Sequence, residues 1–406
     1  MVVMLGKILI NIFLCVFVLN SCLYEKNQAD EKVTKVSEIK EDEILNKVMN
    51  MSLDEKIGQL FIVGFDGNTS LSEKDISLIK DFKVGGLIFF RRNITTANQT
   101  VDLINKIKTI NSENGNVPLF LSLDQEGGLV TRLPEEIIKF HKASVIGEKN
   151  DEEYAYDIAK LMGSITYSMG FNMNFAPVLD IYTNPNNEVI GSRAFSSDKE
   201  IVSKLGVATI KGFKDSNIIA VGKHYPGHGD TSEDSHYELP VLEHDYERVR
   251  NIELYPFEQA INNGLDAVLV SHLLYEKIDS ENIATLSKIF LYEILRKELG
   301  FRGIVITDDM IMKGLTDTES ISEASLKALK AGVDILLIGS GYENISNSIQ
   351  RIKQAVFDGE IDEFEIDRKV YNILRVKRDY MINNNEISEV NVIDINSKIK
   401  EILNKN

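Results

Sequence analysis

The sequence predicts an α/β protein built as a single (β/α)₈ barrel. Eight short apolar runs suited to buried parallel strands alternate with stretches of helical periodicity. Polar side chains capable of chemistry come directly after five of these runs, and barrel enzymes build their sites at the carboxyl ends of their strands. With 406 residues, 43% of them hydrophobic, the chain is long enough for one barrel with a large core. An open, doubly wound sheet is the less favoured alternative.

The chain is expected to begin with a lipoprotein signal over residues 1–21. Lys7 precedes an apolar run, residues 8–19, that is shorter than the roughly 20 residues a bilayer span needs. The run closes on Leu19-Asn20-Ser21-Cys22, which resembles a bacterial lipobox, so we expect lipid on Cys22. This places the protein outside the cytoplasmic membrane, at the cell envelope. An uncleaved anchor and a plain secretion signal are the alternatives.

The two cysteines fit this interpretation. Cys15 would leave with the signal and Cys22 would carry lipid, so the mature chain would have neither a free thiol nor a disulfide. Cysteine catalysis is therefore excluded. The charged residues 22–46 are expected to be a tether.

The barrel domain is expected over residues 47–381, with Ser52 and Glu55 spaced as a capping box near its start. The expected strands are Leu60 to Phe65, Gly86 to Phe90, Leu119 to Asp124, Met173 to Val178, Ile218 to Lys223, Ala267 to Ser271, Gly303 to Thr307 and Asp334 to Ile338. Helical periodicity covers Ala97 to Asn111, Tyr154 to Met169, Asp245 to Asn262, Lys288 to Leu299 and Ser322 to Lys330. A final helix is expected over Glu365 to Met381, followed by a poorly ordered, Asn-rich tail over residues 382–406.

The charge balance narrows the range of partners. The chain has 45 Lys and Arg against 62 Asp and Glu, a net charge of −17, which repels phosphate backbones and anionic membrane surfaces. We therefore expect no nucleic-acid partner, and membrane contact only through the N-terminal lipid.

The segment from Lys223 to His236 concentrates the reactive side chains. Its Pro and Gly residues force an irregular loop at the end of the fifth run. Within it, the Asp234 carboxylate is close enough in sequence to hold one nitrogen of the His236 ring and leave the other for proton transfer. A metal site is the competing interpretation, because His224, His228, His236 and neighbouring aspartates are potential ligands. However, helical zinc sites use His at i and i+4, and these lie on a Gly/Pro loop, so no metal is expected.

Six motifs, in order between Met51 and Met381, resemble the glycoside hydrolase family 3 β-N-acetylhexosaminidases, including those that trim peptidoglycan fragments. They are Met51 to Gln59, Asp124 to Gly128, Asn174 to Asp180, Gly191 to Phe195, the Lys223 to His236 loop and Thr307 to Met310.

The resemblance implies retaining hydrolysis, with Asp308 as the nucleophile, His236 as the general acid/base and Asp234 as the residue that orients His236. The implied substrate-binding positions are Asp124, Arg132, Arg193, Lys223 and His224. For the two arginines a purely structural ion pair stays open. Asp180 is expected to orient the residues that bind the substrate without contacting the substrate itself. His272 either lines the site or satisfies a buried polar group. No cofactor is implied, and Asp309 is given no role.

One position departs from the family pattern. Relatives commonly carry Arg after the Gly-Gly of the third-strand motif, whereas this chain has Leu129, which bears on the aglycone preference. The expected function is an exo-acting β-N-acetylglucosaminidase. A phosphorylase, a β-glucosidase and a non-catalytic sugar-binding lipoprotein are the alternatives.

Overall fold

The computed structural model describes residues 43–232, 239–316 and 319–404. The chain divides into two units, residues 1–51 and residues 52–406. In the first unit, residues 43–50 form a helix. The expected signal, Cys22 and most of the tether lie outside the described residues. Within the described ranges, no helix is both long enough and apolar enough to cross a membrane.

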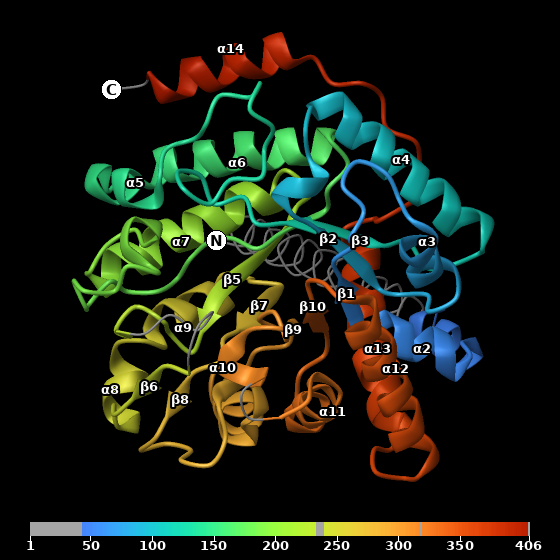
Figure 1. Ribbon diagram of the computed structural model, residues 1–406. Helices are drawn as coiled ribbons and strands as arrows, with labels where there is room; N and C mark the ends of the chain where they lie inside the picture. The colour runs from blue at the N-terminus through green and yellow to red at the C-terminus, as the bar shows by residue number, and fades with distance from the viewer. Residues whose placement is uncertain (1–42, 233–238, 317–318, 405–406) are drawn as a thin grey trace, which may run out of the picture. The chain divides into compact units, whose positions relative to one another are not determined.

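The second unit contains the predicted barrel, with eight short strands paired in parallel (Figure 1). The spatial order is β10 (Leu336–Ile338), β1 (Phe61–Val63), β2 (Gly86–Phe89), β3 (Phe120–Leu123), β4 (Met173–Asn174), β5 (Ile219–Tyr225), β7 (Ala267–Val270) and β9 (Ile304–Thr307). A parallel bridge between Ile306 and Ile335 joins the two ends of this order. Each strand lies in one of the eight predicted runs, and only β5 extends past its run, by two residues to Tyr225. The strands are buried along their length, as parallel strands covered by helices must be.

Helices follow the strands around the barrel. They are α2 (Leu53–Gln59), α3 (Glu73–Lys80), α4 (Ala97–Glu113), α5 (Ala143–Lys149), α6 (Glu152–Ser168), α7 (Lys199–Lys214), α8 (Tyr246–Asn251), α9 (Tyr255–Asn262), the π-helix η4 (Ile289–Glu298), α10 (Lys313–Thr316), α11 (Ile321–Ala331), α12 (Tyr342–Phe357), α13 (Glu363–Asp379) and α14 (Val392–Leu403). Short 3₁₀ turns cover Arg91–Asn93, Gly191–Arg193 and Ala284–Leu286, and β6 (Val241–Leu242) pairs with β8 (Leu274–Tyr275). The Ser52 and Glu55 side chains form the predicted capping box at α2.

Two expectations about helices need correction. The helix expected over Asp245 to Asn262 is divided into α8 and α9, because the backbone turns at Ile252 and Pro256 starts a new helix in its first turn. The tail expected to be poorly ordered contains α14, which packs along α6 and buries Ile395, Ile399 and Ile402 (Figure 1). These three isoleucines are spaced to lie on one side of a helix, so this polar segment has one apolar face, and burial of that face stabilises the helix.

Candidate active site

A pocket of about 390 Å³ opens at the carboxyl ends of the strands. Ligand pockets of this kind combine apolar walls with a few placed polar groups. Its lining is Ile88, Phe90, Asp124, Glu126, Val130, Arg132, Phe175, Val189, Arg193, Lys223, His224, His228, Leu269, Asp308, Asp309, Ile311, Met312 and Leu337. Six predicted site residues, from four separate parts of the sequence, therefore line one pocket: Asp124, Arg132, Arg193, Lys223, His224 and Asp308.

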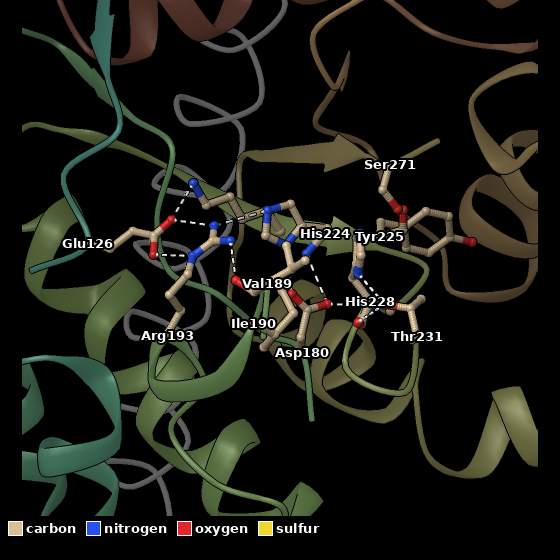
Figure 2. Close-up of polar contacts among 12 residues, drawn as sticks. Glu126, Asp180, Val189, Ile190, Arg193, His224, Tyr225, His228, Thr231 and Ser271 are labelled. Carbon is tan, nitrogen blue, oxygen red and sulfur yellow. Dashed lines mark hydrogen bonds and ion pairs between the residues drawn. The ribbon is translucent and has the colours of Figure 1, made fainter. Parts of the chain in front are cut away.

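Glu126 is the central anion of this pocket. Its carboxylate accepts two hydrogen bonds from Arg193, at 2.9 Å from Nε and 2.8 Å from Nη2 (Figure 2). The same carboxylate lies 2.7 Å from the Lys223 ammonium. Burial opposes ionisation of Glu126, but the two cations outweigh it and lower its pKa to about 2. Glu126 is therefore ionised at neutral pH and holds both cations in place.

Lys223 also binds the second carboxylate of the network. Its Nζ lies 2.8 Å from Asp124 Oδ1, at the start of the loop after β3. Burial lowers the pKa of Lys223, yet Asp124 and Glu126 overcome that effect and raise it above its ordinary value. Arg132 approaches the same carboxylate, with Nη2 4.0 Å from Asp124 Oδ2. The predicted sugar-binding positions thus form one network of alternating charges.

His224 is held by Asp180, whose carboxylate is fully buried. His224 Nδ1 lies 2.6 Å from Asp180 Oδ2, and the backbone N–H groups of His224 and His228 donate to Asp180 Oδ1 (Figure 2). Arg193 Nη2 lies 3.3 Å from His224 Nε2, and a guanidinium can only donate. Nε2 is therefore the acceptor, and the proton on Nδ1 points to Asp180. Burial raises the pKa of Asp180, but His224 and His228 lower it overall.

His228 anchors the start of the predicted acid/base loop. Its Nδ1 lies 2.9 Å from Thr231 Oγ1 (Figure 2). Asn187 donates to the His228 carbonyl oxygen at 2.7 Å. Burial lowers the pKa of His228 to about 4, with the neighbouring His224 adding to the effect, so the ring is neutral at neutral pH. Asp234 and His236 themselves lie outside the described residues.

Asp308 follows β9 directly, on the pocket wall. Its backbone N–H donates to the Val270 carbonyl oxygen at 2.8 Å, and its Oδ1 accepts from the Asp309 backbone N–H at 2.9 Å. Asp309 Oδ1 in turn accepts from the backbone N–H groups of Gly339 and Ile311, at 2.9 and 3.3 Å. Burial raises the pKa of Asp309 to about 6. Two consecutive carboxylates therefore have different surroundings, and Asp309 ties the end of β9 to the end of β10.

Residues 52–376 match the model of the glycosyl hydrolase family 3 N-terminal domain. The chain belongs to glycosyl hydrolase family 3. The match covers most of the barrel unit and confirms the resemblance drawn from the six motifs.

Three similar proteins show the extent of the similarity. Beta-hexosaminidase A of Pseudoalteromonas piscicida is 34% identical over 303 residues, which cover 70% of this chain and 50% of that protein, so the chain spans about half of its length. A beta-hexosaminidase of Pseudomonas aeruginosa (strain LESB58) is 36% identical over 291 residues, or 71% of this chain and 85% of that protein. The structure of a family 3 beta-N-acetylglucosaminidase from Paenibacillus sp. matches with a TM-score of 0.83 and 37% identity, over 87% of this chain and 68% of that chain.

The sequence motifs gave one residue of this site, Glu126, no role, and left two roles open for His272. Glu126 lies in the motif Asp124 to Gly128, close to the predicted binding residue Asp124. The sequence did offer a signal, because the predicted binding positions contain the cations Arg132, Arg193 and Lys223 but only one carboxylate, that of Asp124. Outside the pocket lining, the buried His272 ring contacts Thr285 Oγ1 at 2.8 Å and the Asp309 carbonyl oxygen at 3.1 Å, so it satisfies buried polar groups.

Proposed function

We propose that the protein is a retaining exo-β-N-acetylglucosaminidase. Its substrates are muropeptides or other amino-sugar oligosaccharides with a terminal β-linked N-acetylglucosamine. The observation that carries the proposal is the placement of Asp308 on the wall of a pocket that also presents Asp124, Arg132, Lys223 and His224. The names of the similar proteins, beta-hexosaminidase and beta-N-acetylglucosaminidase, support the same sugar.

In the proposed mechanism, the Asp308 carboxylate attacks the anomeric carbon. The glycosidic bond breaks, its electron pair stays on the leaving oxygen, and His236, oriented by Asp234, donates a proton to that oxygen. A covalent glycosyl-aspartate forms. His236 then takes a proton from water, which attacks the same carbon and releases both the sugar and Asp308.

The charges around Asp308 suit this chemistry. Asp124 and Glu126 are paired with Lys223 and Arg193, so the polar wall adds charged hydrogen-bonding groups with little net charge beside the nucleophile. Charged groups fixed by their partners can hold sugar hydroxyls in one orientation. A histidine acid also avoids adding a further negative charge near Asp308.

The test is nitrophenol release from the β-N-acetylglucosaminide and the β-glucoside, with and without phosphate. We expect selective turnover of the amino sugar, independent of phosphate, with β-configured product. Asp308→Asn should lower kcat by about a thousandfold or more, because the nucleophile is lost. The control is Asp54→Asn, which makes the same change at an exposed ion pair with Lys353.

Each alternative predicts a different result. Turnover that requires phosphate would identify a phosphorylase, and preference for the glucoside would identify a β-glucosidase. Binding of N-acetylglucosamine by a folded protein without turnover of either glycoside would support a sugar-binding lipoprotein.

We further propose that the protein is exported and anchored by lipid on Cys22, on the strength of the sequence pattern. Cys22→Ser should abolish incorporation of labelled fatty acid and release the protein from the membrane fraction. Cys15→Ser, in the apolar run of the signal, is the matched control. Labelling that survives Cys22→Ser would refute the anchor.

A further inference from the structure

The C-terminal segment, residues 382–403, lies beyond the family match, which ends at residue 376. It runs against α4 and α6 and is fastened by asparagine side chains. Asn105 on α4 binds both backbone groups of Ile387, accepting from its N–H at 2.9 Å and donating to its carbonyl oxygen at 2.8 Å. Asn98 accepts from the Val390 N–H at 2.9 Å. The segment is therefore attached to the barrel at defined points before α14 begins.

Asn396 on α14 makes a second clamp of the same kind, but on a different target. Its Oδ1 accepts from the Ile138 backbone N–H at 2.8 Å, and its Nδ2 donates to the Glu136 carbonyl oxygen at 2.7 Å. These residues belong to the loop between β3 and α5, which starts at Asp124 and lines the pocket. The Glu136 side chain also accepts from the Ala97 N–H at the start of α4, at 2.7 Å.

The same loop carries Arg132 into the pocket. Its inner end is fixed by Gln125, whose Oε1 accepts from the backbone N–H groups of Arg132 and Leu133, at 2.8 and 3.2 Å. The Arg132 guanidinium itself is held loosely, by a 3.4 Å hydrogen bond to the Thr131 carbonyl oxygen and the 4.0 Å approach to Asp124. Since these side-chain contacts are weak, the position of the guanidinium depends on the backbone that carries it.

We propose that Asn396 is a positioning residue for substrate binding. The clamp holds the outer end of the loop while Gln125 holds the inner end, and together they keep Arg132 on the pocket wall. Asn396 does not touch the substrate and acts only through the loop. The role of Arg132 in sugar binding belongs to the proposed function, so the kinetic part of this inference rests on it.

The kinetic test compares Asn396→Ala with Asn105→Ala in the full-length protein. Each variant loses a side-chain amide that makes two hydrogen bonds between the C-terminal segment and the barrel. Only the Asn396 amide binds the pocket loop. On nitrophenyl β-N-acetylglucosaminide we expect Asn396→Ala to raise KM about fivefold with kcat within about twofold, and Asn105→Ala to change each by less than about twofold. Equal effects of the two variants would overturn the proposal.

A double-mutant cycle with Arg132→Ala separates positioning from general loosening. If Asn396 acts through Arg132, adding Asn396→Ala to Arg132→Ala should change KM by less than about twofold. A full fivefold effect in that background would show that the clamp acts elsewhere, and would overturn the inference.

Hydrogen exchange supplies a measurement that does not depend on turnover. Backbone amides of residues 130–138 should exchange at least about tenfold faster in Asn396→Ala than in the wild type and in Asn105→Ala. Unchanged exchange in this loop would refute the clamp even if the enzyme is active. A wild-type protein without turnover would refute the proposed function, and the exchange result would still decide whether Asn396 holds the loop.

Discussion

Replacement of Glu126 by Gln isolates the electrostatic centre of the pocket. The side chain is only 5% exposed and binds both Lys223 and Arg193. Its pKa is about 2, against an ordinary value of 4.5. That difference of about 2.5 units, at about 1.4 kcal/mol per unit, corresponds to about 3 kcal/mol of stability from the ionised carboxylate. Gln keeps the shape of the side chain and removes the charge, so Glu126→Gln should lose about that amount at pH 7.

The sign of the pH dependence follows from the lowered pKa of Glu126. The carboxylate releases its proton more readily in the folded protein than in the unfolded chain, so its stabilisation is complete above pH 4.5. It is lost as the pH falls from 4.5 towards 2. Urea unfolding of the wild type and of Glu126→Gln between pH 7 and pH 3 should therefore give two curves that converge on the acid side.

Glu135→Gln is the matched control. Glu135 lies in the same loop and pairs with Arg91, but its side chain is 85% exposed, so we expect less than about 0.5 kcal/mol at any of these pH values. The reasoning would be refuted if the difference between wild type and Glu126→Gln stayed constant from pH 7 to pH 3. A Glu126→Gln variant as stable as the wild type at pH 7 would refute it equally.

Two further substitutions test a carboxyl group in the pocket lining, Asp309, and a close backbone contact of α5 at Gly147. Asp309 has a pKa of about 6 against an ordinary value of 3.8. The free energy of unfolding of the wild type should therefore fall by up to about 3 kcal/mol as the pH rises between these values. Asp309→Asn should remove this loss and be more stable than the wild type at pH 8 in urea unfolding, with no gain at pH 3.5; a less stable variant at pH 8 contradicts the argument. Gly147→Ala would push a methyl group into the Phe195 carbonyl oxygen and should lower the free energy of unfolding by about 3 kcal/mol. The control is Gly359→Ala, where the added methyl group meets open space. Its positive φ alone should lower the free energy of unfolding by about 1 kcal/mol. Equal losses in thermal unfolding would argue that the close contact relaxes freely.

The barrel could be predicted because its strands are buried on both sides. Continuous apolar runs mark such strands directly, and all eight runs contain a strand. The pocket wall could be predicted for a related reason, since the residues after parallel strands converge at one end of a barrel whatever their separation in sequence. Asp124, Lys223 and Asp308 are brought together in this way.

The features that could not be predicted depend on hydrogen-bond partners that lie far apart in sequence and meet only in the folded chain. Asn396 lies in a polar stretch that predicts a disordered tail by composition, but the Ile138 and Glu136 backbone groups that it binds are about 260 residues away. No local pattern announces such a pair. The division between α8 and α9 could have been predicted from the sequence, because a proline inside a helical stretch, here Pro256, marks a helix boundary.

Pairing of the pocket's charges reconciles two properties that otherwise conflict, a highly charged wall and a neutral sugar as the proposed ligand. Buried unpaired ions would be costly and would bind counter-ions in preference to hydroxyls. Here Asp180 holds His224, Glu126 holds Arg193, and Lys223 bridges to Asp124, so each group is stabilised by another protein group before any ligand arrives. Each of these pairs joins a residue at the carboxyl end of one strand, or in the segment that follows it, to a residue at the end of another strand or in the segment after it. The contacts that neutralise the wall therefore also fix its geometry, which is the condition for recognising a small sugar by direction as well as by charge.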